Sequence, residues 1–389
     1  MLSLIVLAAT LGAVRALLVP GPVGPFPVAM RVQELMDESR WDPYAPAHEA
    51  HRRRILVSVF LPLEPGRSAK TPVQVVPYMP PATAALYGLA AGTVTPLAKD
   101  IFSRFSIEYH QLPPAQNRSR DRPKPRYPVV LFSPGLGVPR LLYSAGARAL
   151  AGQGYAVITV DHPYDASIVE FPDGSVVHAA NMTSIPDIIR AIEVRVADMS
   201  FLVDRLHDPS ALKQLTGGFP GAVDVTKVAM YGHSLGGATA AAAMLKDKRI
   251  LGGMNWDGHI FGPVADKGFD RPFALVGIQD HNAMPNSNWP ELYSHLRGPK
   301  VELAVANTQH MSFSDLPLLT TALHIPDTDR AAVEAVIGSL NGRRLQRTTV
   351  GIITAFLDFV FEGKAEGVRN LGNEFCHLSV VKSRLPGGT

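Results

Sequence analysis

The chain has 389 residues, of which 46% are apolar, so it is long and hydrophobic enough to bury a sizeable core and is unlike a disordered protein. The formal net charge of +3 is small for this length and gives no support for nucleic-acid binding. Two basic stretches, residues 51–54 and 118–126, are expected to be solvated. Cys376 is the only cysteine, which excludes an intrachain disulfide, and we expect a buried or half-buried thiol.

The N-terminus carries an apolar run from Met1 to Ala13 that is too short to span a membrane. It is typical of a secretory signal peptide, with small residues placed for cleavage after Ala16; the alternative is an uncleaved anchor. No other stretch reaches transmembrane length. Asn117 and Asn181 each begin an Asn-x-Ser/Thr sequon and are candidates for glycosylation. The sequence therefore predicts a signal peptide of residues 1–16, a single domain of residues 17–389, and secretion.

In chain order, the predicted elements alternate between strands and helices. Residues 20–50 are rich in Pro, Gly and polar groups and are expected to be irregular. Strands are expected at 54–61, 73–78, 127–132, 155–160, 225–230, 250–255, 273–278 and 301–306. Helices are expected at 144–153, 185–206, 238–246, 331–340 and 350–361. Short apolar runs bounded by Pro and Gly are typical of parallel strands buried on both faces. The pattern predicts an α/β fold with a mostly parallel sheet flanked by helices.

The strongest motif is Gly232-His-Ser234-Leu-Gly236, between the strand predicted at 225–230 and the helix predicted at 238–246. A serine on a sharp strand-to-helix turn is the nucleophile elbow of the α/β-hydrolases. The helix N-terminus behind it supplies N–H groups for a developing oxyanion. We therefore predict that Ser234 is the nucleophile of a serine hydrolase with the α/β-hydrolase fold.

The partners of such a serine follow it in the order acid, then histidine, each after a strand. His310 lies just after the strand predicted at 301–306 and is the predicted general base. The other histidines downstream are less well placed: His259, His281, His295, His324 and His377. Asp257 and Asp280 each follow a predicted strand, and the residues alone leave the choice of acid open.

The oxyanion hole requires two backbone N–H groups. One is expected from Leu235, the residue after the nucleophile. The second is expected from Leu136, in the glycine-containing loop Ser133-Pro-Gly-Leu-Gly137 after an early strand. We find neither a metal-ligand spacing nor a phosphate-binding glycine loop, so we expect no cofactor and no metal.

These motifs together resemble the secreted platelet-activating-factor acetylhydrolase family, which is related to plasma lipoprotein-associated phospholipase A2 and has fungal and bacterial members. The resemblance extends from about residue 20 to residue 320. The stretches that carry it are Gly24–Val28, Arg53–Phe60, Phe132–Gly137, Asp161–Asp165, Gly232–Thr239, Asn255–Gly258 and His310–Asp315. Jointly they are specific, whereas the elbow alone is not.

The resemblance implies that the acid is Asp257, in the Asn-Trp-Asp-Gly segment, and that Leu136 and Leu235 are the oxyanion donors. It implies calcium-independent release of a short or oxidised acyl chain from the sn-2 position of a phospholipid. Pro134 is a departure, because some relatives carry His there. Backbone donation from Leu136 does not need that side chain, so the departure bears on substrate preference.

The expected partner is therefore a phospholipid or other ester substrate, with a transient contact to a lipid interface. Residues that could form an apolar rim, or else pack as core, are Trp289, Leu292, Tyr293, Phe313, Leu316, Leu318 and Leu319. The alternative functions are a broader secreted carboxylesterase or lipase on non-phospholipid esters and a catalytically silent binding protein, which the intact set of Ser234, Asp257 and His310 disfavours.

Overall fold

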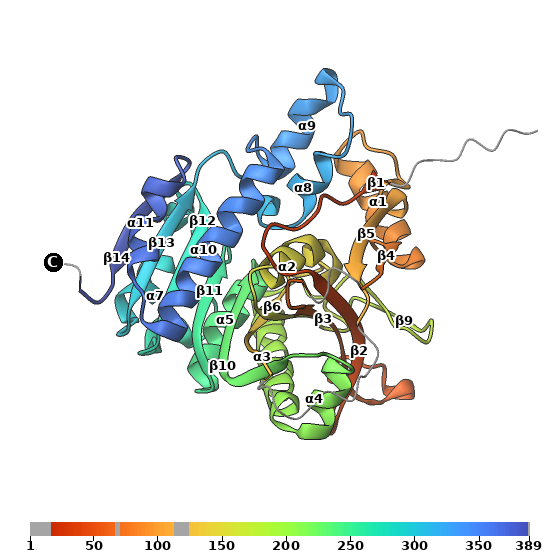
Figure 1. The fold of residues 1–389 in the computed structure, drawn as a ribbon, viewed down its shortest axis with the longest axis horizontal. Coiled ribbons are helices and arrows are strands. Elements are labelled where there is room, and N and C mark those ends of the chain that lie inside the picture. The colour runs from red at the N-terminus through yellow and green to blue at the C-terminus, as the bar shows by residue number, and fades with distance from the viewer. Residues whose placement is uncertain (1–16, 67–70, 113–123, 388–389) are drawn as a thin grey trace, which may run out of the picture.

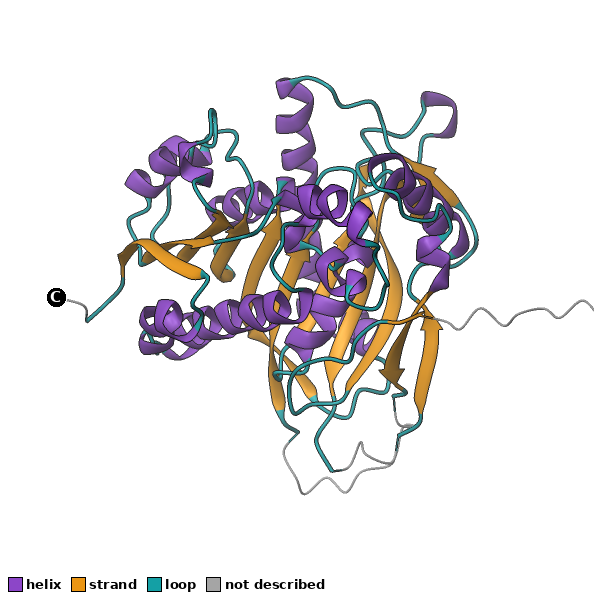
Figure 2. Ribbon diagram, turned by 90° about the horizontal axis from the view of Figure 1, so that it is seen from above, coloured by secondary structure: helices purple, strands orange, loops and turns teal. Residues whose placement is uncertain are grey.

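The computed structural model describes residues 17–66, 71–112 and 124–387. The predicted signal peptide and the sequon at Asn117 lie outside these residues. Within them, a mixed sheet of twelve strands carries helices on both faces, and a separate hairpin is formed by β8 (Ile168–Glu170) and β9 (Val176–His178). Figure 2 shows the twist of the sheet and the helices on either side of it. The predicted fold class, a mostly parallel central sheet flanked by helices, is confirmed.

Strand order across the sheet is β1-β5-β2-β3-β7-β6-β10-β11-β12-β13-β14, with β4 paired to β5 (Figure 1). The strands from β7 to β13 in that order are parallel to one another. The bounds are β1 (Leu17–Leu18), β2 (Val28–Trp41), β3 (Arg52–Pro62), β4 (Val73–Pro77), β5 (Phe105–His110), β6 (Arg126–Ser133), β7 (Ala156–Asp161), β10 (Ala222–His233), β11 (Ile250–Trp256), β12 (Phe273–Ile278), β13 (Lys300–Val305) and β14 (Leu378–Arg384).

Helices α2 and α10 pack against one face of this sheet, and α3 and α5 cover the other. The helix bounds are α1 (Pro81–Val94), α2 (Ser144–Ala151), α3 (Ile185–His207), α4 (Pro209–Thr216), α5 (Leu235–Lys246), α6 (Val264–Lys267), α7 (Trp289–His295), α8 (Leu316–Thr320), α9 (Asp327–Ile337), α10 (Gly342–Glu362) and α11 (Glu366–Glu374). No helix of the described ranges is long and apolar enough to cross a bilayer.

The central strands are apolar on both faces because both faces are covered. In β10, Val228 and Met230 pack under α3 and α5, whereas Ala229 and Tyr231 face α2 and α10. Alternate residues of a strand point to opposite faces, so a continuous apolar run is what a doubly covered strand requires. The carboxyl ends of β6, β10, β11 and β13 meet at one edge, where an open α/β sheet places its ligand site.

Three expectations were wrong. Residues 20–50 contain the long strand β2, which pairs antiparallel with β3. Arg53, in the basic stretch expected to be solvated, is 1% exposed and forms ion pairs with Asp42 and Asp198. Cys376 is exposed rather than buried. Polar residues punctuate β2, since several of its positions are partly exposed, and this obscured the strand pattern.

The C-terminal segment completes the sheet. After α10, helix α11 leads into β14, which pairs antiparallel with β13 at the edge opposite β4 and β5 (Figure 1). Only Leu378 of β14 is buried. An edge strand that is largely exposed needs no apolar run, so no periodic signal marked it in the sequence.

Candidate active site

Ser234 occupies the turn between β10 and α5 with φ 55° and ψ −121°. Such a backbone costs about 1–3 kcal/mol for a residue with a side chain and persists only where its surroundings enforce it. Here the Ser234 N–H donates to Trp256 O at 2.8 Å. A Cβ on Gly232 would lie 2.2 Å from the Gly236 backbone, and one on Gly236 would lie 1.9 Å from Ser133 O. Both glycines of the motif are therefore required by close backbone approach.

Asp257 follows β11 with φ 54°, held by its neighbours. Asn255 accepts from the Gly258 N–H and donates to its carbonyl, both at 2.8 Å, which closes the turn around Asp257. Asp257 Oδ2 accepts from His310 Nδ1 at 2.6 Å. A neutral imidazole that donates from Nδ1 keeps its lone pair on Nε2. The ring of His310 is therefore oriented to accept a proton at Nε2.

The second oxygen of Asp257 is held by two further donors. His281 Nδ1 lies 2.7 Å from Oδ1, and the Ile278 N–H donates to the same oxygen at 2.9 Å. Burial favours the neutral acid, but the hydrogen bonds from His281 and His310 outweigh it and lower the pKa of Asp257 to about 2. The carboxylate is thus ionised over the whole physiological range. The sequence suggested His281 only as a less well placed general base, although its position three residues after β12 was a signal for a place in the site.

Asp280, the other candidate for the acid, is exposed with φ 63° and makes no side-chain hydrogen bond to a described residue. The fold therefore brings Asp257, and not Asp280, to His310. Of the other downstream histidines, only His281 forms a hydrogen bond with Asp257. Ser234 Oγ makes no hydrogen bond to any described residue; in unliganded sites such contacts are often long and tighten only with substrate.

His233, inside the elbow motif, links the two loops that flank Ser234. Its Nε2 lies 2.9 Å from His310 O, a carbonyl that only accepts, so Nε2 carries the proton. Nδ1 then accepts from the Tyr143 hydroxyl at 2.7 Å, and that hydroxyl accepts from the Gly135 N–H at 3.3 Å. Burial, reinforced by the neighbouring His310, lowers the pKa of His233 to about 3, so this ring is neutral. The sequence alone had predicted no structural role for His233 or for Tyr143.

Leu136 and Leu235 carry the two predicted oxyanion donors. Leu235 opens α5, so its N–H has no acceptor within the helix. Neither N–H donates a hydrogen bond to another described residue. The Leu136 loop lies against the nucleophile, since a Cβ on Gly135 would be 3.4 Å from Ser234 Cβ. Among the described residues, no group of three or more His, Cys, Asp or Glu side chains is arranged to hold a metal ion.

The residues weighed as an apolar rim or as core are mostly core. Those that are buried are Trp289, Leu292, Phe313, Leu318 and Leu319, while Tyr293 and Leu316 are half-buried. The Leu136 side chain is by contrast 36% exposed beside the nucleophile. Exposed apolar residues therefore lie both in the loop after β6, at Leu136, and in the segment after β12, where Met284 is 40% exposed.

Comparison with known proteins adds to this geometry. The family model described as platelet-activating factor acetylhydrolase, isoform II, matches residues 49–179 and 187–325. The chain is 30% identical over 378 residues to a probable 1-alkyl-2-acetylglycerophosphocholine esterase of Arthroderma benhamiae, covering 90% of each chain. It is 28% identical over 250 residues to a platelet-activating factor acetylhydrolase of Bos taurus, covering 54% of this chain and 53% of that one.

Among solved structures, a ferulic acid esterase from Streptomyces cinnamoneus aligns with a TM-score of 0.73 and 27% identity, covering 94% of this chain and 99% of that one.

Proposed function

This chain belongs to the platelet-activating factor acetylhydrolase isoform II family and is an esterase, and from that premise we propose that it hydrolyses the sn-2 acetyl or short acyl ester of platelet-activating-factor-like phospholipids. The observation that carries the proposal is the Asp257–His310 pair at 2.6 Å, beside a serine held at φ 55°. The arrangement supports a Ser234–His310–Asp257 triad, which needs no calcium.

In the proposed mechanism, Ser234 Oγ attacks the ester carbonyl while His310 Nε2 takes the hydroxyl proton. The tetrahedral oxyanion is held by the N–H groups of Leu136 and Leu235. Collapse breaks the ester bond, and the proton on His310 passes to the departing lysophospholipid alcohol. Water, deprotonated by His310, then attacks the acyl-enzyme and releases the carboxylic acid. Asp257 stays ionised throughout and stabilises the imidazolium.

Export belongs to the same proposal. The apolar N-terminus with a cleavage site after Ala16 supports secretion, and Asn181 is exposed and available for glycosylation. The exposed Leu136 supports a transient contact with a lipid surface during substrate capture. N-terminal sequencing of the protein from a secreting host tests the first point, because a mature chain that begins at Met1 contradicts it.

A second candidate is a broader carboxylesterase that acts on non-phospholipid esters. The alignment with a ferulic acid esterase over nearly the whole of both chains favours it. The two candidates share the site and differ in what the mouth of the site accepts.

The experiment is a three-substrate assay on wild type and Ser234→Ala, with chelator throughout. The substrates are a 2-acetyl ether phospholipid, a nitrophenyl acetate and a feruloyl ester. We expect serine-dependent turnover, most efficient on the phospholipid. Turnover of the soluble or aromatic ester without the phospholipid supports the second candidate. Full activity in Ser234→Ala contradicts the nucleophile.

A further inference from the structure

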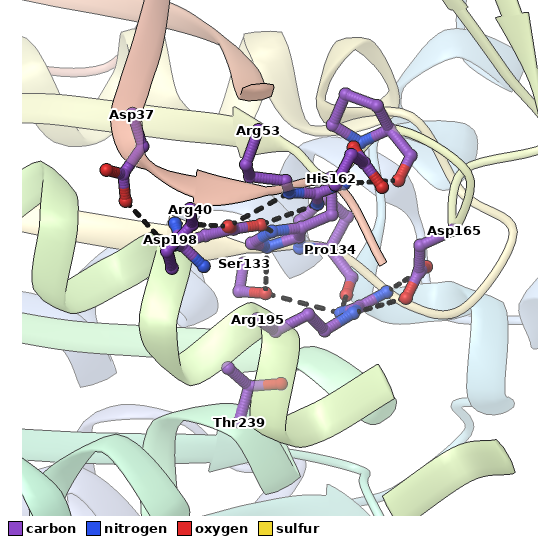
Figure 3. Close-up of polar contacts among 12 residues, drawn as sticks. Asp37, Arg40, Arg53, Ser133, Pro134, His162, Asp165, Arg195, Asp198 and Thr239 are labelled. Atoms are coloured by element: carbon purple, nitrogen blue, oxygen red, sulfur yellow. Dashed lines mark hydrogen bonds and ion pairs between the residues drawn. The ribbon is translucent and has the colours of Figure 1, made fainter. Parts of the chain in front are cut away.

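A buried arginine on α3, Arg195, forms hydrogen bonds with the oxyanion loop, residues 133–137, which carries the Leu136 N–H. Arg195 is 1% exposed and donates from one terminal nitrogen to Pro134 O at 2.5 Å and to Ser133 Oγ at 3.3 Å (Figure 3). Its other terminal nitrogen donates to Gly135 O at 3.2 Å. One side chain therefore binds three consecutive residues of the loop.

The arginine is itself held in place. Arg195 Nε donates to Asp165 Oδ2 at 2.7 Å, and the terminal nitrogen that binds Gly135 also pairs with Asp165 Oδ1 (Figure 3). With these two contacts and the three to the loop, all five guanidinium N–H groups have acceptors. A lysine has three donors and no planar fork, so it cannot reproduce this set.

The consequence for the oxyanion donor follows from peptide geometry. The Gly135 carbonyl and the Leu136 N–H belong to one trans peptide plane and point in opposite directions. Because Arg195 fixes that carbonyl on the α3 side, the Leu136 N–H is directed away from α3. Gly135 itself lies against the Ser234 side chain. The carbonyl contact thus sets the direction of the one backbone donor that the loop contributes.

We propose that Arg195 is a positioning residue that pre-organises the Leu136 N–H for the oxyanion; this rests on the proposed hydrolysis at Ser234. A donor aimed before the reaction stabilises the transition state without reorganisation, whereas a peptide free to rotate does not. The residue touches no substrate atom. Its effect is expected in kcat and in the binding of transition-state mimics rather than in KM.

The same buried network supplies a matched control. Arg53 on β3 is also 1% exposed and pairs with Asp198 at 2.7 Å and Asp42 at 2.8 Å. It donates to the Pro163 carbonyl at 3.0 Å but to no residue of the oxyanion loop. Asp198 leads through His162 to Ser133 Oγ, so Arg53 shares the network without binding the loop carbonyls (Figure 3).

The test compares Arg195→Lys with Arg53→Lys, measuring the melting temperature, kcat and KM on nitrophenyl acetate, and the Ki of an aryl trifluoromethyl ketone, which forms a tetrahedral adduct with serine. We expect Arg195→Lys to lower kcat about 10- to 100-fold, with KM within about threefold and Ki raised in parallel. Arg53→Lys should lower the melting temperature while the kcat of the folded protein stays near that of wild type.

Asp165→Asn changes the partner of Arg195 at nearly constant side-chain size, and it replaces Arg195→Lys in the test if that variant does not fold. We expect it to lower kcat and raise Ki by smaller factors than Arg195→Lys. Wild-type kcat and Ki in the folded variant overturn the inference, as does a loss confined to KM or an equal loss in Arg53→Lys. If Ser234→Ala is inactive while Arg195→Lys is normal, only this inference fails. If Ser234→Ala retains activity, the proposed function fails, and the inference fails with it.

Discussion

Buried His281 donates from Nδ1 to Oδ1 of Asp257 at 2.7 Å, using the carboxylate oxygen that His310 leaves free. The acid is therefore held between two imidazoles. The ring of His281 also packs against that of Trp289, with centroids 4.2 Å apart and planes inclined by 31°, which restricts its orientation. In this way a loop after β12 contributes to a site whose other members follow β6, β10, β11 and β13.

We predict that His281→Phe, which keeps the ring and removes the donor, lowers kcat about tenfold by loosening the orientation of Asp257. Without that hydrogen bond the pKa of Asp257 rises. A carboxyl with a depressed pKa stabilises the fold above its unfolded pKa of about 4 and loses this effect as pH falls towards 2. The unfolding free energy of the variant, measured in urea, should therefore lie below that of wild type at pH 5, and the difference should shrink as the pH is lowered to 2.

His259→Phe is the control for His281→Phe, because His259 lies beside His281, with ring centroids 5.4 Å apart, and makes no hydrogen bond to a described residue. Its kcat should match that of wild type. A gap between wild type and His281→Phe that stays constant with pH would show that the loss comes from packing alone.

Tyr143→Phe is expected to destabilise the protein by about 1–3 kcal/mol, because it leaves the Gly135 N–H and His233 Nδ1 without their buried partner. Urea unfolding measures the loss. Tyr155→Phe is the control: its hydroxyl makes one longer contact, 3.3 Å to Asp358, and should cost less than about 1 kcal/mol. Equal losses in the two variants would argue against a special role for the Tyr143 hydroxyl.

We predict that buried Asp315 makes the stability of the folded protein depend on pH. Burial raises its pKa to about 6, although it accepts hydrogen bonds from Tyr78 and from the N–H groups of Ala145 and Gly146. A folded pKa above the unfolded value near 4 means that the contribution of this group is complete below about pH 4 and is lost as pH rises through 6. The free-energy difference between wild type and Asp315→Asn should shift against wild type from pH 4 to pH 7. A pH-independent difference would contradict this.

Gly236→Ala should lower stability by more than about 3 kcal/mol, since its new Cβ would lie 1.9 Å from Ser133 O and push the elbow away from β6. Thermal unfolding is the measurement. Gly21→Ala, with nothing within 4 Å of the added atom, should be nearly neutral. A stable Gly236→Ala with wild-type activity would mean that the close approach at the elbow is not required.

The strand and helix pattern could be predicted from the sequence because it is written in local periodicity. The central strands from β6 to β13 are short apolar runs, and α3 carries apolar residues at helical spacing along its buried face. Strands without such runs were not predicted: polar residues interrupt the apolar pattern of β2, and β14 is exposed at an edge of the sheet. The elbow at Ser234 was visible because its serine and glycines form a contiguous motif between a predicted strand and a predicted helix.

Contacts between distant segments were decided only by the tertiary structure. Asp257 and Asp280 each follow a strand, and nothing local separates them; the folded sheet, in which β12 lies between β11 and β13, brings Asp257 and not Asp280 to His310. The sequence suggests that Arg53 is a surface charge, whereas in the folded chain it is buried and paired with Asp42 and Asp198. Arg195 donates to Gly135, which lies 60 residues earlier in the chain. His281, in the loop after β12, donates to Asp257, in the loop after the neighbouring strand β11. A hydrogen bond between distant segments leaves no period in the sequence, because only the folded chain defines which groups are neighbours.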